Sequence, residues 1–169
     1  MKKVVASIIA MSFVLGCYSQ TDIPKAQSMF IYNFCRFVEW PQSATSGPFV
    51  IGVLGGTDIT NALTEYTTGK MVGMQNIVVK QIKDVASVEN CHILVVSYGK
   101  CGSLPEIVTK VGSFPTLIVA DRKNSLALGA AINFLLEDDR LKFELSVGNA
   151  TKNGLKLNSK LQEMASAVK

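Results

Sequence analysis

The stretch Phe49-Val-Ile-Gly-Val-Leu-Gly-Gly56 decides the fold class of this chain of 169 residues. An almost unbroken apolar run that ends in paired glycines is typical of a strand buried on both faces of a sheet. Thr57 or Asp58 can then cap a helix that runs to about Thr67. The stretch therefore predicts a strand followed at once by a helix, which is the repeating unit of α/β proteins.

The same alternation continues along the chain. We predict strands at residues 77–79 with Ile82, at 92–96 and at 116–120, and a single helical turn within 84–90. Ser103-Leu-Pro-Glu106 has the pattern of a capping box and predicts a helix to about Val111, which Gly112 ends. Alternating strands and helices predict a mostly parallel central sheet that is covered on both faces.

The region before residue 49 predicts a first helix. Phe30, Phe34 and Phe37 recur at i, i+4 and i+7 after Pro24, and proline is favoured at the first helical position. Trp40-Pro41 ends this helix, because the residue before a proline avoids the α region.

The region after residue 120 predicts a β-hairpin and a terminal helix. Residues 131–136 and 140–145 form its strands, and alternating apolar and charged residues in 141–145 predict one buried face. A short helix near 149–152, a strand at 155–157 and a second capping box, Ser159-Lys-Leu-Gln162, complete the chain. The predicted fold class is α/β: a mostly parallel central sheet flanked by helices on both faces, with a C-terminal β-hairpin and a terminal helix.

Residues 1–19 have the layout of a secretory signal peptide. Lys2 and Lys3 precede an apolar run at 4–15 that is too short to span a bilayer, and small residues permit cleavage before Gln20. Val14-Leu15-Gly16-Cys17 also resembles a lipobox, in which Cys17 would be acylated and would tether the protein to a membrane. The bulk of Leu15 favours ordinary cleavage. We expect an exported protein whose residues 20–169 form a single domain.

Composition excludes several classes of function. Hydrophobic residues make up 48% of the chain and charged residues 18%, which excludes disorder as the main state. The net charge is +4, and removal of Lys2 and Lys3 with the signal leaves +2, too little for an electrostatic nucleic-acid footprint. His92 is the single histidine, so a multi-histidine metal site is excluded, and we expect no metal.

Export would place Cys35, Cys91 and Cys101 in an oxidising compartment, where an odd number leaves at least one thiol unpaired. A strand after Cys91 would separate it from Cys101 by about 20 Å, which disfavours that disulfide. Cys35–Cys91, Cys35–Cys101 and three buried free thiols stay open as alternatives.

Two clusters could carry chemistry, and each has a simpler structural interpretation. Gly55-Gly56 lies between a strand and a helix, where phosphate-binding loops occur, but it lacks the G-x-G-x-x-G and Walker A patterns. A tight turn is favoured there. Glu137, Asp138 and Asp139 could serve metal or acid–base chemistry, but their position favours a hairpin turn, with Arg140 pairing to a flanking carboxylate.

No catalytic set is visible in the sequence. The side chains considered as nucleophiles are those of Ser97, Ser103, Ser159 and Cys91. Each would need a base, and His92 begins an apolar strand. We therefore expect no enzyme activity and no cofactor. Tyr32, Trp40 and Tyr98 are amphipathic aromatics that would serve as core or, where exposed, as contact anchors.

Three parts of the chain resemble the YfiR-like family of periplasmic proteins. These parts are Tyr32–Pro41 with 49–55, Cys91–Ser97, and Ile132–Glu144 with Gly154–Leu161. The similarity covers roughly residues 24–166. It implies a compact α/β domain without chemistry that dimerises in the periplasm. The family's namesake represses an inner-membrane diguanylate cyclase by binding its sensor portion, and an outer-membrane lipoprotein can sequester it. A lipobox at Cys17 would depart from a freely soluble repressor.

The resemblance suggests candidate partner contacts, and the predicted sheet suggests a candidate ligand site. The partner-contact candidates are Glu39, Trp40, Pro41, Glu137, Asp139, Arg140 and Lys142. In the alternative hypothesis the protein is a small-ligand sensor for a nucleotide or an amino acid, with a crevice at the carboxyl ends of the parallel strands. The crevice candidates are Gly55, Gly56, Ser97, Tyr98, Asp121 and Arg122.

Overall fold

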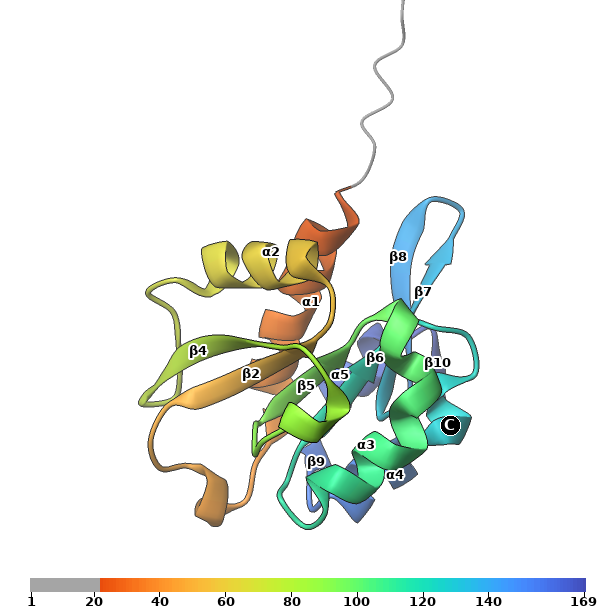
Figure 1. Cartoon of the computed structure of the whole chain (residues 1–169). Coiled ribbons are helices and arrows are strands. Elements are labelled where there is room, and N and C mark those ends of the chain that lie inside the picture. Colours follow the sequence, from red (N-terminus) through yellow and green to blue (C-terminus); the bar gives the residue numbers. More distant parts are fainter. Residues whose placement is uncertain (1–21) are drawn as a thin grey trace, which may run out of the picture.

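An eight-stranded sheet in the order β10-β8-β7-β6-β5-β2-β4-β3 forms the centre of the structure (Figure 1). The computed structural model describes residues 22–169, so the predicted signal peptide and Cys17 lie outside the described residues. The strands are β2 (Phe49–Leu54), β3 (Met71–Val72), β4 (Gln75–Ile82), β5 (Ile93–Val96), β6 (Leu117–Ala120), β7 (Ile132–Glu137), β8 (Arg140–Leu145) and β10 (Ala167–Val168).

Most neighbouring strands are parallel. β4, β2, β5, β6 and β7 run in one direction, whereas β8 is antiparallel to β7 and β3 is antiparallel to β4. β10 pairs in parallel with the end of β8. A separate two-stranded ladder joins β1 (Val38–Glu39) to β9 (Lys156–Leu157). The predicted α/β class with a mostly parallel sheet and a C-terminal hairpin is confirmed.

The two faces of the sheet are covered by different helices. α1 (Ile23–Phe37), α2 (Thr57–Thr67), α4 (Val147–Lys152) and α5 (Ser159–Met164) contribute to the core on one face. α3 (Leu104–Val111) covers the other face. The short 3₁₀ turns are η1 (Gln42–Ala44), η2 (Val85–Ser87), η3 (Tyr98–Ser103) and η4 (Ser125–Leu128). None of the described helices is long and apolar enough to cross a membrane.

Aromatic packing fixes α1 against the hairpin strands. Phe34 is fully buried, and its ring centroid lies 5.1 Å from that of Phe143 and 5.9 Å from that of Phe134. Phe30 lies 5.6 Å from Phe143. The helical spacing of these phenylalanines therefore places them on one face of α1, and this face is buried on the sheet as the sequence predicts.

The local predictions are wrong at several element ends. α1 ends at Phe37, because Val38 and Glu39 join β9 before Trp40-Pro41 is reached. The Ser103 side chain makes no cap hydrogen bond, because η3 runs directly into α3. Asn158, not Ser159, caps α5 by accepting a hydrogen bond from the Lys160 N–H.

The three described cysteines are buried free thiols, so neither Cys35–Cys91 nor Cys35–Cys101 is formed. Cys35 belongs to the core under α1, whereas Cys91 and Cys101 belong to the core under α3, on the other face of the sheet. Burial raises the pKa of the Cys91 thiol to about 12 and that of Cys35 further still. These thiols are packed as small hydrophobic groups and are poor nucleophiles.

Candidate functional site

The chain changes its direction across the sheet between β2 and β5. After β2 it passes through α2 to β4 on one side, and after β5 it passes through α3 to β6 on the other. α2 and α3 lie on opposite faces of the sheet. The loops that leave β2 and β5 therefore diverge at their carboxyl ends, and open α/β sheets bind ligands at such a point.

Gly55, Gly56 and Ser97 meet at this point. Both glycines have positive φ, +76° and +65°, and Gly56 is the N-cap residue of α2. A Cβ atom on Gly56 would lie 2.3 Å from the Ser97 Oγ, so only glycine fits between the turn and the hydroxyl. The Ser97 Oγ is buried and has no hydrogen-bond partner. The residues form the tight turn that the sequence favours, and the hydroxyl beneath it is unsatisfied.

Asp121, Tyr98 and Arg122 follow the neighbouring strand ends. Desolvation raises the pKa of the Asp121 carboxyl, and the Cys101 thiol lies 3.8 Å from its Oδ1. Tyr98 is exposed, and the Arg122 guanidinium lies 5.8 Å from the centre of its ring. The structure thus brings the six crevice candidates together at the carboxyl ends of the parallel strands, which is where the sequence places them.

The end of the β7–β8 hairpin stands out from the sheet, as Figure 1 shows in blue. β6 pairs with β7 only at Ile132 and Asn133, and β10 pairs with β8 only at Glu144 and Leu145. Residues 135–142, which we call the arm, therefore pair with each other and with no other described strand. Two-stranded ribbons contribute little stability of their own.

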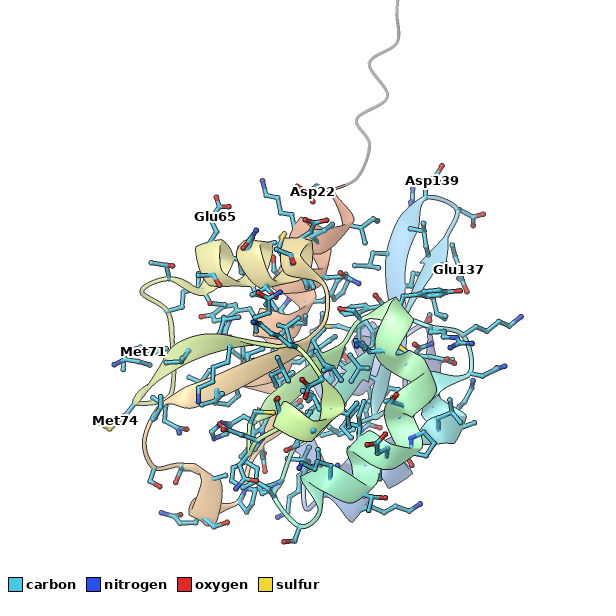
Figure 2. The ribbon with its side chains drawn as sticks, viewed as in Figure 1. Asp22, Glu65, Met71, Met74, Glu137 and Asp139 are labelled. Atoms are coloured by element: carbon cyan, nitrogen blue, oxygen red, sulfur yellow. The ribbon has the colours of Figure 1, made fainter. Side chains whose placement is uncertain are left out.

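The arm carries an apolar face and a charged tip. Leu136 pairs across the arm with Leu141, and Leu136 is 60% exposed although it continues the row of buried residues Ile132 and Phe134. The buried face predicted for residues 141–145 is confirmed, with Leu141 partly buried against the core, whereas Leu136 on the opposite strand is exposed. Figure 2 shows Asp139 at the outer end of the arm and Glu137 on the side of the arm.

The tip is a two-residue hairpin turn. Asp138 and Asp139 have φ of +51° and +57°, and Glu137 pairs with Arg140, so the predicted turn is confirmed. The Glu137 carboxylate accepts a hydrogen bond of 3.0 Å from the Lys142 Nζ. Glu137, a flanking carboxylate predicted to pair with Arg140, thus pairs with Lys142 instead, and the Arg140 side chain is exposed.

Glu39, Trp40 and Pro41 lie at the amino ends of the strands, far from the arm along the parallel sheet. The Trp40 indole packs edge-on against Phe49, with ring centroids 4.9 Å apart, and its Nε1–H donates to the Pro115 carbonyl at 3.1 Å. Glu39 is exposed, whereas Trp40 and Pro41 are partly buried. The seven partner candidates therefore form two groups at opposite ends of the sheet, and Trp40 has a structural role in the first.

His92 completes this aromatic cluster. Its ring stacks on Phe49 at 4.3 Å, its Nδ1 accepts from the Val50 N–H at 3.0 Å, and its Nε2 lies 2.7 Å from the Ala44 carbonyl. Because Nδ1 accepts, Nε2 must carry the proton that is donated to Ala44. Desolvation lowers the pKa of His92. His92 lies at the opposite end of β5 from Ser97, so the two cannot form a nucleophile–base pair.

A further hollow lies on the α3 face of the sheet, beside strand β4. It has a volume of about 320 Å³, with Val50, Gly52 and Cys91 in its lining and Lys80 and Glu89 among its charged groups. Lys80 and Glu89 pair at 3.7 Å. Within residues 22–169, no three His, Cys, Asp or Glu side chains are grouped to hold a metal ion.

Sequence reasoning missed Leu136 as a surface residue. The alternation around Leu141, its partner across the arm, predicts which side chains share a face and not how far that face is covered. How much of the face is covered is a property of the assembled fold.

Solved structures share this fold at low sequence identity. A conserved domain protein from Vibrio cholerae matches with a TM-score of 0.57 and 9% identity, over 84% of this chain and 60% of that chain. The ABC domain in complex with L-Trp from Streptococcus pneumonia matches with a TM-score of 0.52 and 10% identity, over 71% and 55%. This chain thus spans less than two thirds of either structure. No curated protein matches it.

The fold and the exposed groups define a small α/β domain with a projecting hairpin arm. The family described as DUF4154, YfiR/HmsC-like, matches residues 24–166. The chain belongs to this family, and the resemblance seen in the sequence is confirmed. Membership supports a regulatory role in the periplasm.

Proposed function

We propose that this protein represses an inner-membrane signalling enzyme, a diguanylate cyclase, by docking on the sensor part that the enzyme exposes to the periplasm. In this proposal the protein does no chemistry and holds cyclic-di-GMP synthesis down. An outer-membrane lipoprotein that sequesters it would release the cyclase. Family membership supports the periplasmic regulatory part, and the cyclase as target follows the family's namesake.

The arm is the observation that carries the proposal. Exposed leucine on a ribbon with free edges is costly to leave in water, and apolar patches with a charged rim are typical of protein contact sites. Leu136 supplies the apolar part and Glu137, Asp139, Arg140 and Lys142 supply the rim. Because the arm contributes little to the core, a partner can bind it without rearranging the sheet.

The test compares two exposed leucines in cells. Leu136→Asp places a charge on the arm, whereas Leu128→Asp places the same charge on η4, where Leu128 is 41% exposed. We expect Leu136→Asp to raise cyclic-di-GMP to the level of a deletion strain and Leu128→Asp to leave it unchanged. Arg140→Glu should act in the same direction as Leu136→Asp.

Two results would contradict the proposal. Folded Leu136→Asp protein with unchanged cyclic-di-GMP would exclude the arm as the contact, provided that the deletion raises cyclic-di-GMP. A deletion without effect on cyclic-di-GMP would exclude the cyclase. Crosslinking in cells, followed by mass spectrometry, would identify the membrane protein that is lost from the Leu136→Asp variant.

A second candidate function is a small-ligand sensor at the carboxyl ends of the strands. The unsatisfied Ser97 hydroxyl and the desolvated Asp121 carboxyl favour it. One structure that shares the fold is described as a complex with L-Trp. A ligand that binds the native state raises the melting temperature, so a thermal-shift screen of nucleotides and amino acids, L-Trp included, tests the idea. Absence of any shift would contradict it.

A further inference from the structure

The edge of the sheet farthest from the arm is open along β4. β3 pairs with β4 only at Gln75 and Asn76, and the Ile77 N–H reaches the Lys70 carbonyl at 3.4 Å. No described strand pairs with the outer side of residues 78–82. Residues 78–82 are also rich in β-branched residues and have no proline or bulge to protect them, and such an edge invites another strand.

The free backbone groups on this edge can be assigned. The Ile82 carbonyl accepts from the Gly55 N–H, on the β2 side, and the Ile77 N–H faces outward to Lys70. Backbone groups in a strand alternate between its two edges. Val79 and Gln81 therefore present their N–H and C=O groups outward.

The segment that forms the edge carries exposed apolar side chains and lysines, and Glu89 from outside the segment pairs with Lys80 at 3.7 Å. Met71, Met74 and Val78 are exposed large hydrophobic residues, with Met74 94% exposed, and Figure 2 shows Met71 and Met74 at this end of the molecule. Lys70, Lys80 and Lys83 are the charged residues between positions 70 and 83, and this segment has no Asp or Glu. The edge thus offers hydrogen bonds, apolar contact and positive charge together.

A second copy of this chain is a poor occupant for the edge. β3 and Lys70 cover the outer side as far as Ile77, so two copies can pair only through 78–82. A two-fold axis through an antiparallel pair of these segments passes through Lys80. The two Lys80 residues would then face each other as a non-hydrogen-bonded pair, with Cα atoms about 4.5 Å apart. Like charges in this position are destabilising.

We propose that the free edge of β4 is a strand-addition site for an extended segment of a partner protein that carries a carboxylate opposite Lys80. Val79 and Gln81 would supply the main-chain hydrogen bonds and Lys80 would select the acidic segment, which is how β-augmentation divides affinity and specificity. The inference is independent of the proposed role of the arm, because the two surfaces lie at opposite edges of the sheet.

The experiment selects nine-residue peptides from an unbiased display library on the exported protein. We expect binders with a central Asp or Glu, and we expect hydrogen exchange to show new protection at the Val79 and Gln81 amides. Lys80→Glu should weaken their binding at least about 10-fold, and peptides with Lys in place of the acidic residue should recover it. The salt bridge from Lys80 to Glu89 is exposed, so this variant should fold normally.

Gln81→Pro is the second variant, because it removes an outward N–H that pairs with no described strand, and proline is tolerated on the solvent side of an edge strand. It should abolish peptide binding without changing the fold seen by circular dichroism. The inference is overturned if no peptide binds, if binding is indifferent to Lys80→Glu, or if protection appears elsewhere. It is also overturned if sedimentation shows that the chain is a dimer and that Gln81→Pro makes it a monomer, because copies of the chain would then pair through this edge.

Discussion

The two ends of the parallel strands are built in opposite ways. At the amino ends, Trp40, Phe49 and His92 fill the space, and both the indole N–H and the imidazole nitrogens have hydrogen-bond partners. At the carboxyl ends, Ser97 has an unsatisfied hydroxyl and Leu136 is exposed on the arm. The comparison separates residues that hold the fold from residues that are free to contact something else.

The largest expected effect is at the amino ends. Phe49 is 1% exposed and touches both other aromatic rings of the cluster, so Phe49→Ala should lower the free energy of unfolding by about 3–5 kcal/mol. Leu136→Ala, at the other end, should change it by less than about 0.5 kcal/mol. Urea denaturation of the two variants measures the difference. Equal losses of stability in the two variants would show that the two ends of the strands do not differ in their contribution to the fold.

A smaller effect is expected for the hydrogen bond of Trp40. Trp40→Phe keeps an aromatic ring beside Phe49 but removes the donor to the Pro115 carbonyl, which should cost about 1 kcal/mol of stability. Because Trp40 acts in the fold, cyclic-di-GMP in cells should stay at the wild-type level while the protein remains folded. A rise in cyclic-di-GMP with unchanged stability would make Trp40 a partner contact.

His92 should make the amino ends sensitive to pH. Its pKa is lowered in the fold from the ordinary value of 6.5, so the unfolded state binds the proton more readily. The neutral His92 ring therefore makes its full contribution to the free energy of unfolding above pH 6.5, and this contribution is lost as the pH falls below 6.5. The melting temperature should drop from pH 7.5 to pH 5.5, and His92→Asn should flatten this dependence. A drop of the same size in both proteins would place its cause elsewhere.

The smallest effect on stability is expected at Ser97. Ser97→Ala removes a buried hydroxyl that has no partner, so the free energy of unfolding should stay within about 0.5 kcal/mol of wild type or rise. Matched denaturation curves measure this. A loss above 1 kcal/mol would show that the hydroxyl is satisfied in solution and would remove the distinction between the two ends.

Buried strands were predictable because their composition is extreme. Residues 49–54 and 117–120 are apolar on both faces, which is the pattern of a central strand. Helix starts were less predictable. Ser103 and Ser159 have good capping sequences, but a 3₁₀ turn and Asn158, respectively, take over at those starts. Capping patterns identify where a helix can begin, and competing neighbours decide where it does.

The grouping of the crevice candidates was predictable from the sequence, whereas the positions of the partner candidates relative to one another were not. The crevice residues follow strand ends, and the carboxyl ends of parallel strands share an edge, so their meeting follows from the fold class. The partner candidates come from two motifs about 100 positions apart in the sequence, Glu39–Pro41 and Glu137–Lys142. Only the assembled sheet shows that these motifs lie at opposite ends.

The isolation of the arm has an evolutionary consequence. Except at Leu141, which packs against the core, substitutions in residues 135–142 change a surface on which the core does not depend, so they are nearly free of the stability threshold that constrains most of the chain. A duplicated copy of such a protein can acquire a new partner by altering a few arm residues while the sheet stays intact. The same architecture makes recognition and folding separable traits on which selection can act one at a time.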